Sequence, residues 1–125
     1  MNLNQVTVPT HNVEASVAFY RLLGMKPIVL SKHYARFELP RGEATFSVML
    51  AEGKIAQAEG VHVYFECDDV DSEVARLKAA GVSFHQEPAD QPWLWREAWF
   101  KDISGNSLCL YHAGSNRKYP PWRLG

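Results

Sequence analysis

The chain has 125 residues, of which 46% are apolar and 22% are charged, with 13 basic and 14 acidic side chains. This length matches one ordinary domain, and a net charge of −1 gives no electrostatic footprint for DNA or RNA. No apolar run approaches the roughly 18 residues that a membrane span needs, and the N-terminus lacks the features of a signal peptide. Two cysteines do not make a disulfide scaffold. We therefore expect a cytoplasmic protein with no nucleic-acid or membrane partner.

The chain contains an internal repeat. The segment from Gln5 to Gly24 aligns without a gap with the segment from His62 to Gly81. Each copy begins with a short alternating apolar run, typical of a strand, followed by a polar residue that can cap a helix. The capping residues are Asn12 in the first copy and Asp69 in the second. The apolar residues expected on one face of the helix are Val13, Val17 and Tyr20 in the first copy, and Val70, Val74 and Leu77 in the second. The closing glycine of each copy predicts the helix end.

Strand-like sequence follows each predicted helix. The strands are expected over Pro27–Leu30, Tyr34–Leu39 and Thr45–Leu50 in the first copy, and over Val82–Gln86, Arg96–Lys101 and Ser107–Tyr111 in the second. The second copy is longer because it contains Glu87–Trp95, which we interpret as an inserted loop rich in proline and tryptophan. Each copy is therefore predicted to be a βαβββ module.

The repeat predicts an α+β fold in one domain over residues 1–125. Module 1 is expected at residues 1–50, a linker at 51–60, module 2 at 61–112 and a C-terminal tail at 113–125. One module leaves a sheet face unprotected, so the two should form a concave, cupped mixed sheet with the helices outside. The modules can pair within one chain or exchange between the chains of a dimer. The tail can pack Trp122 over the sheet or a partner, or it can be a frayed end.

This tandem repeat resembles the vicinal oxygen chelate superfamily, which includes glyoxalase I, bleomycin-resistance proteins, fosfomycin-resistance enzymes and extradiol dioxygenases. The resemblance covers essentially residues 1–112. It is carried by Ala18-Phe19-Tyr20-Arg21-Leu22-Leu23-Gly24-Met25, by His62-Val63-Tyr64-Phe65-Glu66-Cys67-Asp68-Asp69-Val70 and by Asp102-Ile103-Ser104-Gly105-Asn106. It implies a small-molecule ligand in the cupped sheet and a homodimer.

The resemblance also implies four metal-ligand positions, which here hold Gln5, His62, Ser47 and Cys109. Glyoxalases carry glutamate where Ser47 and Cys109 stand. Divalent Ni, Fe, Mn or Mg needs anionic oxygen or several imidazoles, and this set offers neither. If Cys109 is ionised, its thiolate and His62 could suit a soft ion such as Zn or Cu(I), but with fewer protein ligands than a typical zinc site supplies. Glu66 shares a strand face with His62, so it could supply a carboxylate and act as the catalytic acid or base. Otherwise His62 lines a cavity, hydrogen-bonded to Gln5 or Tyr64, and Cys109 is a small buried thiol.

Strand alternation predicts the rest of the site. One apolar set should pack under the helices: Val6, Val8, Phe46, Val48, Val63, Phe65, Leu108 and Leu110. The opposite face mixes aromatic, polar and titratable groups, which is typical of a ligand pocket. The predicted ligand-binding residues are Met49, Tyr64, Trp93, Trp95, Arg96, Trp99 and Tyr111, a set suited to flat aromatic or anionic ligands. The tryptophans could instead form a subunit interface.

Two functions follow from this pattern. The first is a binding protein like the bleomycin-resistance proteins, which holds a small planar or anionic ligand without a full metal site. The second is a metal-dependent lyase, isomerase or dioxygenase with an altered ligand set built from Gln5, His62 and either Cys109 or Glu66. The missing carboxylate ligands favour the first function, and no cofactor is assigned beyond that alternative divalent metal.

Overall fold

The computed structural model describes residues 1–55 and 60–125, and the chain divides into two compact units. One unit comprises Met1–Gly60 together with Asp102–Asn106, and the other comprises Val61–Lys101 together with Ser107–Gly125. Residues 56–59 of the linker expected at 51–60 lie outside the described residues. The grouping of both modules into one domain, the homodimer and the cytoplasmic location stay predictions. In the described part of the chain, neither helix is long and apolar enough to cross a membrane.

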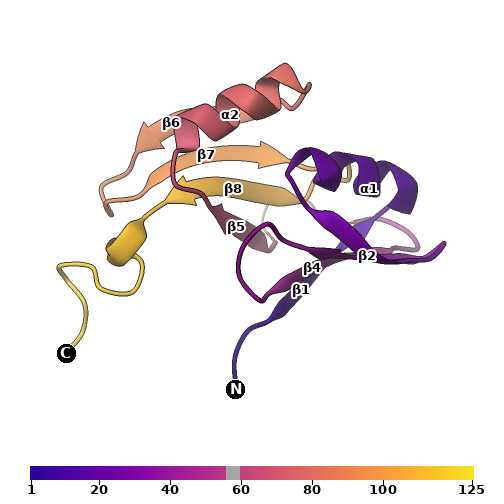
Figure 1. Cartoon of the computed structure of the whole chain (residues 1–125), viewed down its shortest axis with the longest axis horizontal. Helices are drawn as coiled ribbons and strands as arrows, with labels where there is room; N and C mark the ends of the chain where they lie inside the picture. Colours follow the sequence, from indigo (N-terminus) through magenta and orange to yellow (C-terminus); the bar gives the residue numbers. More distant parts are fainter. Residues whose placement is uncertain (56–59) are drawn as a thin grey trace. The chain divides into compact units, whose positions relative to one another are not determined.

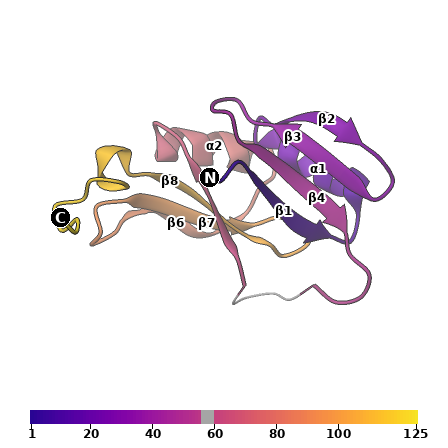
Figure 2. The same ribbon diagram turned by 90° about the horizontal axis from the view of Figure 1, so that it is seen from below.

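The first unit is a βαβββ module. Its sheet has the order β1-β4-β3-β2, with β1 parallel to β4 and the other pairs antiparallel. Its elements are β1 (Gln5–Thr10), α1 (Val13–Leu22), β2 (Lys26–Leu30), β3 (Tyr34–Glu38) and β4 (Thr45–Leu50). Helix α1 covers one face of this sheet (Figures 1 and 2) and leaves the other face open.

The second unit repeats the same arrangement. Its sheet has the order β5-β8-β7-β6, again with one parallel pair, β5 and β8. Its elements are β5 (His62–Glu66), α2 (Val70–Ala79), β6 (Phe84–Asp90), β7 (Arg96–Lys101) and β8 (Ser107–His112), followed by a short 3-10 helix over Gly114–Asn116. Helix α2 covers one face of this sheet (Figure 1). The predicted α+β class and the tandem βαβββ modules are therefore confirmed.

The helix ends follow the predicted capping chemistry. The side chain of Asn12 accepts a hydrogen bond from the backbone N–H of Ala15, and that of Asp69 accepts one from Ser72. Each bond satisfies a backbone donor that the first helical turn leaves free. Gly24 and Gly81 follow the two helices with φ of 91° and 100°, a left-handed conformation that strongly favours glycine.

Each core lies between a helix and its own sheet. Under α1 the rings of Tyr20, Phe37 and Phe46 are packed together, with Tyr20 and Phe46 centroids 4.7 Å apart. Under α2, Leu77 is fully buried, and the ring centroids of Phe100 and Phe84 lie 4.8 Å apart. The predicted apolar set is buried, except that Val6, Val63 and Phe65 are only partly covered. These three lie on β1 and β5, which are the outer strands of their sheets.

The first unit differs from its prediction in one helix position, and in the tail the structure bears on one of the alternatives that the sequence left open. In α1 the buried positions are Val13, Ser16 and Tyr20, whereas Val17 is only partly buried. Ser16 is accommodated because its hydroxyl is hydrogen-bonded to that of Thr10 at 2.6 Å, so no polar group is left unpaired. In the tail, the Trp122 side chain stays 55% exposed, so it is not buried against the sheet.

The predicted inserted loop at Glu87–Trp95 is wrong in its first half. Strand β6 continues to Asp90 and pairs with β7 through Ala89 and Glu97. The pairing register is irregular on both sides of Gln86. Pro88 can lie within the strand because edge strands and β-bulges tolerate a proline, which has no N–H to donate. The insertion therefore lengthens a hairpin and leaves only a tight connection before β7.

The turn between β7 and β8 belongs to the first compact unit. Its Asp102 carboxylate accepts a 2.6 Å hydrogen bond from the buried hydroxyl of Tyr20. The same carboxylate accepts bonds from the backbone N–H of Ser104 and from both the backbone and side-chain nitrogens of Asn106. Burial and the neighbouring Asp102 raise the pKa of Tyr20, so Tyr20 stays protonated and acts as the donor.

Candidate functional site

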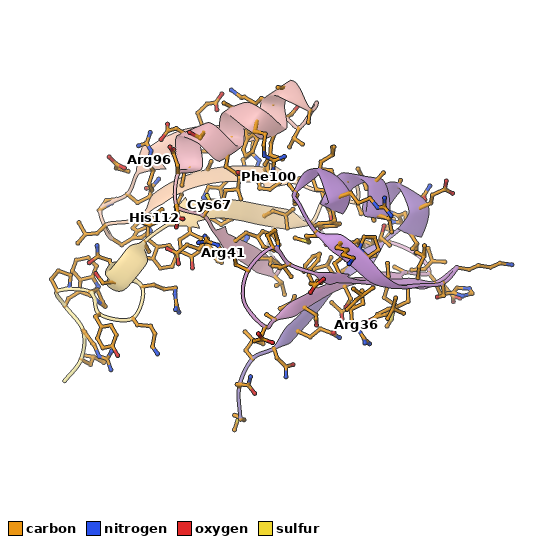
Figure 3. The ribbon with its side chains drawn as sticks, in the orientation of Figure 1. Arg36, Arg41, Cys67, Arg96, Phe100 and His112 are labelled. Carbon is orange, nitrogen blue, oxygen red and sulfur yellow. The ribbon has the colours of Figure 1, made fainter. Side chains whose placement is uncertain are left out.

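The open face of the second sheet carries most of the predicted site. Strand register places Tyr64, Cys109 and Trp99 side by side in one row across β5, β8 and β7. The next row contains Glu66, Tyr111 and Glu97. Because successive side chains of a strand alternate between faces, these rows lie opposite the residues that pack under α2. One of those is Phe100, which Figure 3 shows between β7 and α2.

The aromatic side chains of this face form one connected group, which we call the aromatic face: Tyr64, Trp95, Trp99 and Tyr111. Trp95 and Tyr111 are stacked, with centroids 4.6 Å apart and planes 19° apart. The ring of Tyr64 meets the other three edge-on at 5.5–5.9 Å and remains 44% exposed. The structure therefore brings these four predicted ligand-binding residues together.

A buried carboxylate that was not among the predicted site residues holds the tryptophans. Glu97 is only 4% exposed, and its Oε1 accepts a 2.9 Å hydrogen bond from Trp99 Nε1–H. Its Oε2 accepts a 2.6 Å bond from Trp93 Nε1–H. Both oxygens of one side chain thus fix two indoles in place. The signal for this role is the alternation of Trp95, Glu97 and Trp99 along one side of the strand.

Arg96 lies elsewhere, contrary to its predicted place in the pocket. Its guanidinium donates two hydrogen bonds to Asp71 in the first turn of α2, and a third to Asp90. Figure 3 accordingly shows Arg96 beside the start of α2. The hydrogen bonds that Arg96 donates to Asp71 and Asp90 raise its pKa. Arg96 therefore does not supply the cation that the sequence placed at the aromatic face.

Glu66 is engaged by the start of the tail. Its Oε2 accepts hydrogen bonds from the backbone N–H groups of Ala113 at 2.7 Å and Gly114 at 2.9 Å. His112 lies 3.8 Å from the same oxygen and is itself hydrogen-bonded to the backbone carbonyl of Cys67. These bonds tie the chain after β8 to β5, so Glu66 acts here as an anchor for the segment that follows Tyr111.

The four family metal positions carry donors that do not fit a divalent ion. In the second unit, His62 is hydrogen-bonded to Ser107 at 3.0 Å, and Cys109 is a fully buried thiol. In the first unit, the oxygen of Gln5 accepts from Thr45 at 2.7 Å, and the hydroxyl of Ser47 is hydrogen-bonded to Thr7 at 2.5 Å. No set of three His, Cys, Asp or Glu side chains suited to a metal gathers among the described residues.

Cys109 stays a neutral thiol at physiological pH. Burial raises its pKa to about 12, and the charge of Glu97 acts in the same direction. Burial and surrounding carboxylates likewise raise the pKa of Cys67 to about 11. Because the thiolate is the nucleophile and the metal ligand, neither residue is activated.

We expect both cysteines to resist iodoacetamide at neutral pH in the folded protein. Their raised pKa values keep the reactive thiolate scarce until unfolding exposes them. Mass spectrometry of the alkylated protein, with and without urea, measures this difference at each cysteine. Rapid modification of Cys109 in the folded protein would contradict the neutral, buried thiol.

The open face of the first sheet has a different character. Register places Thr7, Ser47 and Arg36 in one row across β1, β4 and β3. Tyr34 lies in the adjacent row beside Met49, the remaining predicted ligand-binding residue, which is 52% exposed. Arg36 Nε donates a 2.9 Å hydrogen bond to the hydroxyl of Tyr34, and its guanidinium carbon lies 5.5 Å from the centre of that ring. Figure 3 shows Arg36 pointing away from α1.

Comparisons with known proteins identify the family of this fold. A family model described as the Glyoxalase/Bleomycin resistance protein/Dioxygenase superfamily matches residues 2–110. No curated protein matches the chain. A glyoxalase/bleomycin resistance protein/dioxygenase from Nocardioides shares 24% identity and a TM-score of 0.78, over 100% of this chain and 90% of that one.

Two further solved structures share the fold at lower identity. A lactoylglutathione lyase from Agrobacterium tumefaciens is 19% identical, with a TM-score of 0.74 over 89% of this chain and 92% of that one. A bleomycin-binding protein in complex with bleomycin is also 19% identical, with a TM-score of 0.73 over 90% and 98% of the two chains.

Proposed function

The chain belongs to the glyoxalase/bleomycin resistance protein/dioxygenase superfamily, and we propose that it binds a small planar molecule on the aromatic face of its second sheet without a metal ion. The observation that carries this proposal is the aromatic face itself, in which Trp95 stacks on Tyr111 while Tyr64 stays almost half exposed. Binding of a small molecule at the superfamily level is supported by the bleomycin-binding protein that shares the fold.

The arrangement of the rings suits a flat ligand. Aromatic groups attract one another in offset-stacked or edge-on geometry, and a flat ligand gains such contacts with several rings at once. Trp93 is 45% exposed next to this face, and its indole is held by Glu97. Because the rings are fixed before binding, little side-chain freedom is lost when a ligand arrives.

The charge of the face favours a cationic or neutral ligand over an anionic one. Glu97 places a carboxylate among the rings, whereas Arg96 is bound to carboxylates beside α2. Burial raises the pKa of Tyr64, and the carboxylate of Glu97 acts in the same direction, so Glu97 contributes negative charge near the exposed ring of Tyr64. Lys101 lies at the other end of the face, two rows from Glu97. We therefore propose a planar ligand that is cationic or neutral, in place of the anionic ligand expected from Arg96.

The metal-dependent alternative finds no support in the donor groups. A lyase, isomerase or dioxygenase of the expected kind needs an ionised ligand at Cys109 or Glu66. The first is a thiol with a pKa of about 12, and Oε2 of Glu66 is already bonded to the backbone N–H groups of Ala113 and Gly114, which hold the tail. We therefore propose a binding role that needs no metal chemistry.

The proposal is tested with three ligands that share one ring system but differ in charge: N-methylquinolinium, quinoline and a quinoline sulfonate. Tryptophan fluorescence should be quenched saturably, with the cation binding most tightly and the sulfonate most weakly. Replacing Trp95 with leucine should weaken N-methylquinolinium binding by roughly tenfold, because the stacked pair is lost.

The matched control is Trp122→Leu, which removes an exposed tryptophan of the tail and should leave the affinity unchanged. Tighter binding of the sulfonate than of the cation would contradict the proposal. So would stoichiometric metal in protein purified without chelator, if His62→Ala removed both the metal and the binding.

A further inference from the structure

The open face of the first sheet carries an arginine whose charge is not matched by an acidic partner. In the described part of the chain, no carboxylate lies within ion-pair distance of Arg36, whereas Arg96 contacts two. We propose that Arg36 and Tyr34 form a binding site for an oxyanion, the carboxylate or phosphoryl group of a small molecule. This site goes beyond the proposed function because it lies on the other sheet and takes the opposite charge.

Three adjacent strands build the site. Arg36 projects from β3, beside Ser47 of β4, which in turn lies beside Thr7 of β1. Ser47 is fully buried, and its hydroxyl is hydrogen-bonded to that of Thr7. The site therefore has a partly exposed guanidinium beside a buried serine whose hydroxyl is already hydrogen-bonded to Thr7.

Tyr34 is the second polar group of the proposed site. Its oxygen accepts from Arg36 Nε at 2.9 Å. Burial raises the pKa of Tyr34, but interactions with Ser47, Arg36 and Gln5 outweigh burial and hold the pKa below its ordinary value. A phenol whose oxygen accepts such bonds is a stronger O–H donor. Its hydrogen bond to an anion would be stronger than one to a neutral acceptor.

The guanidinium is oriented for an oxyanion as well. The bond to Tyr34 uses Nε and fixes the plane of the group, so the edge that carries the two terminal nitrogens can face a ligand. Such a planar fork matches the two oxygens of a carboxylate or phosphate, which a lysine cannot do. Glu38 shares this face one row away, but no ion pair with Arg36 is formed in the described residues.

Isothermal titration calorimetry with sodium benzoate and with inorganic phosphate tests the site. We expect saturable binding of at least one anion, weakened roughly tenfold or more in Arg36→Gln because a charge-assisted fork is lost. Tyr34→Phe should weaken it by a smaller factor. The matched control is Arg96→Gln, which removes a guanidinium already bound to Asp71 and Asp90 and should leave anion affinity unchanged. Comparison of the two anions shows which oxyanion the site prefers.

Two readouts keep the test decisive. If Arg36→Gln does not fold, Arg36→Lys keeps the charge without the fork and should still bind benzoate more weakly than the native protein. Tyrosine labelled with carbon-13 at Cζ should show a benzoate-dependent NMR shift that is absent from Tyr34→Phe. Equal affinity in the native protein and folded Arg36→Gln, or no binding of either anion, would overturn the site. N-methylquinolinium binding should persist in Arg36→Gln, so failure here is distinguishable from failure of the proposed function.

Discussion

Replacing Asp102 with alanine is expected to lower the free energy of unfolding by about 3–5 kcal/mol. The carboxylate accepts four hydrogen bonds, from the hydroxyl of Tyr20, the backbone of Ser104 and two nitrogens of Asn106. Its removal leaves a buried hydroxyl under α1 without a partner, and removes the group that shapes the turn. Because small proteins are stable by only about 5–15 kcal/mol, urea denaturation followed by circular dichroism should register a large loss.

Two further variants separate this role from the loss of any acidic residue. Tyr20→Phe removes one of the four bonds and leaves the turn intact, so its effect should be smaller, about 1–2 kcal/mol. Asp90→Ala removes an exposed carboxylate that pairs with Arg96, and should change stability little. Equal destabilisation by Asp102→Ala and Asp90→Ala would contradict the role of the buried network.

The repeat made most of the fold predictable because its signals are local. The capping side chains of Asn12 and Asp69 bond to the backbone within the same helical turn, and glycine at positions 24 and 81 serves a left-handed backbone conformation. Such choices need no tertiary contact to be recognised. The extent of β6 was less predictable, because a proline such as Pro88 is typical of a loop. Only the irregular pairing of β6 with β7 shows that the strand accommodates it.

Strand alternation predicted which side chains share the open face of the second sheet, whereas the expected place of Arg96 was wrong. Alternation brought Tyr64 and Tyr111 to one face, and the structure places their rings 5.8 Å apart. Arg96 was assigned to the same pocket together with Trp93 and Trp95 of the predicted inserted loop. Neighbouring residues on a strand face opposite sides, so Arg96 meets Asp71 of α2, and Glu97 points to the rings.

The contacts of Glu66 and Cys109 could not be read from the pattern. The partners of Glu66 are backbone N–H groups of Ala113 and Gly114, which carry no side-chain signal in the sequence. The raised pKa of Cys109 depends first on burial and then on the charge of Glu97, and both follow from packing of the complete sheet. The family resemblance therefore indicates which residue occupies a metal-ligand position, but it does not give the protonation state of that residue.

Replacing Glu97 with glutamine is expected to reduce the preference for N-methylquinolinium over the quinoline sulfonate by about tenfold or more. The amide keeps the size of the side chain but removes the negative charge from the aromatic face. Only one of its two terminal groups can accept a bond, so the indole of either Trp93 or Trp99 meets an N–H instead of an oxygen. We therefore also expect a loss of about 1–3 kcal/mol in unfolding free energy. Fluorescence titration and urea denaturation measure the two effects on the same protein.

The matched control is Glu73→Gln, which neutralises a partly exposed carboxylate paired with Arg76 on α2. It changes the net charge by the same amount, so any long-range effect of charge on ligand affinity should appear equally in both variants. A change in ligand preference confined to Glu97→Gln then assigns the selectivity to the carboxylate among the rings. If both variants change the preference equally, Glu97 only positions the tryptophans, and the cation selectivity belongs to the protein's overall charge.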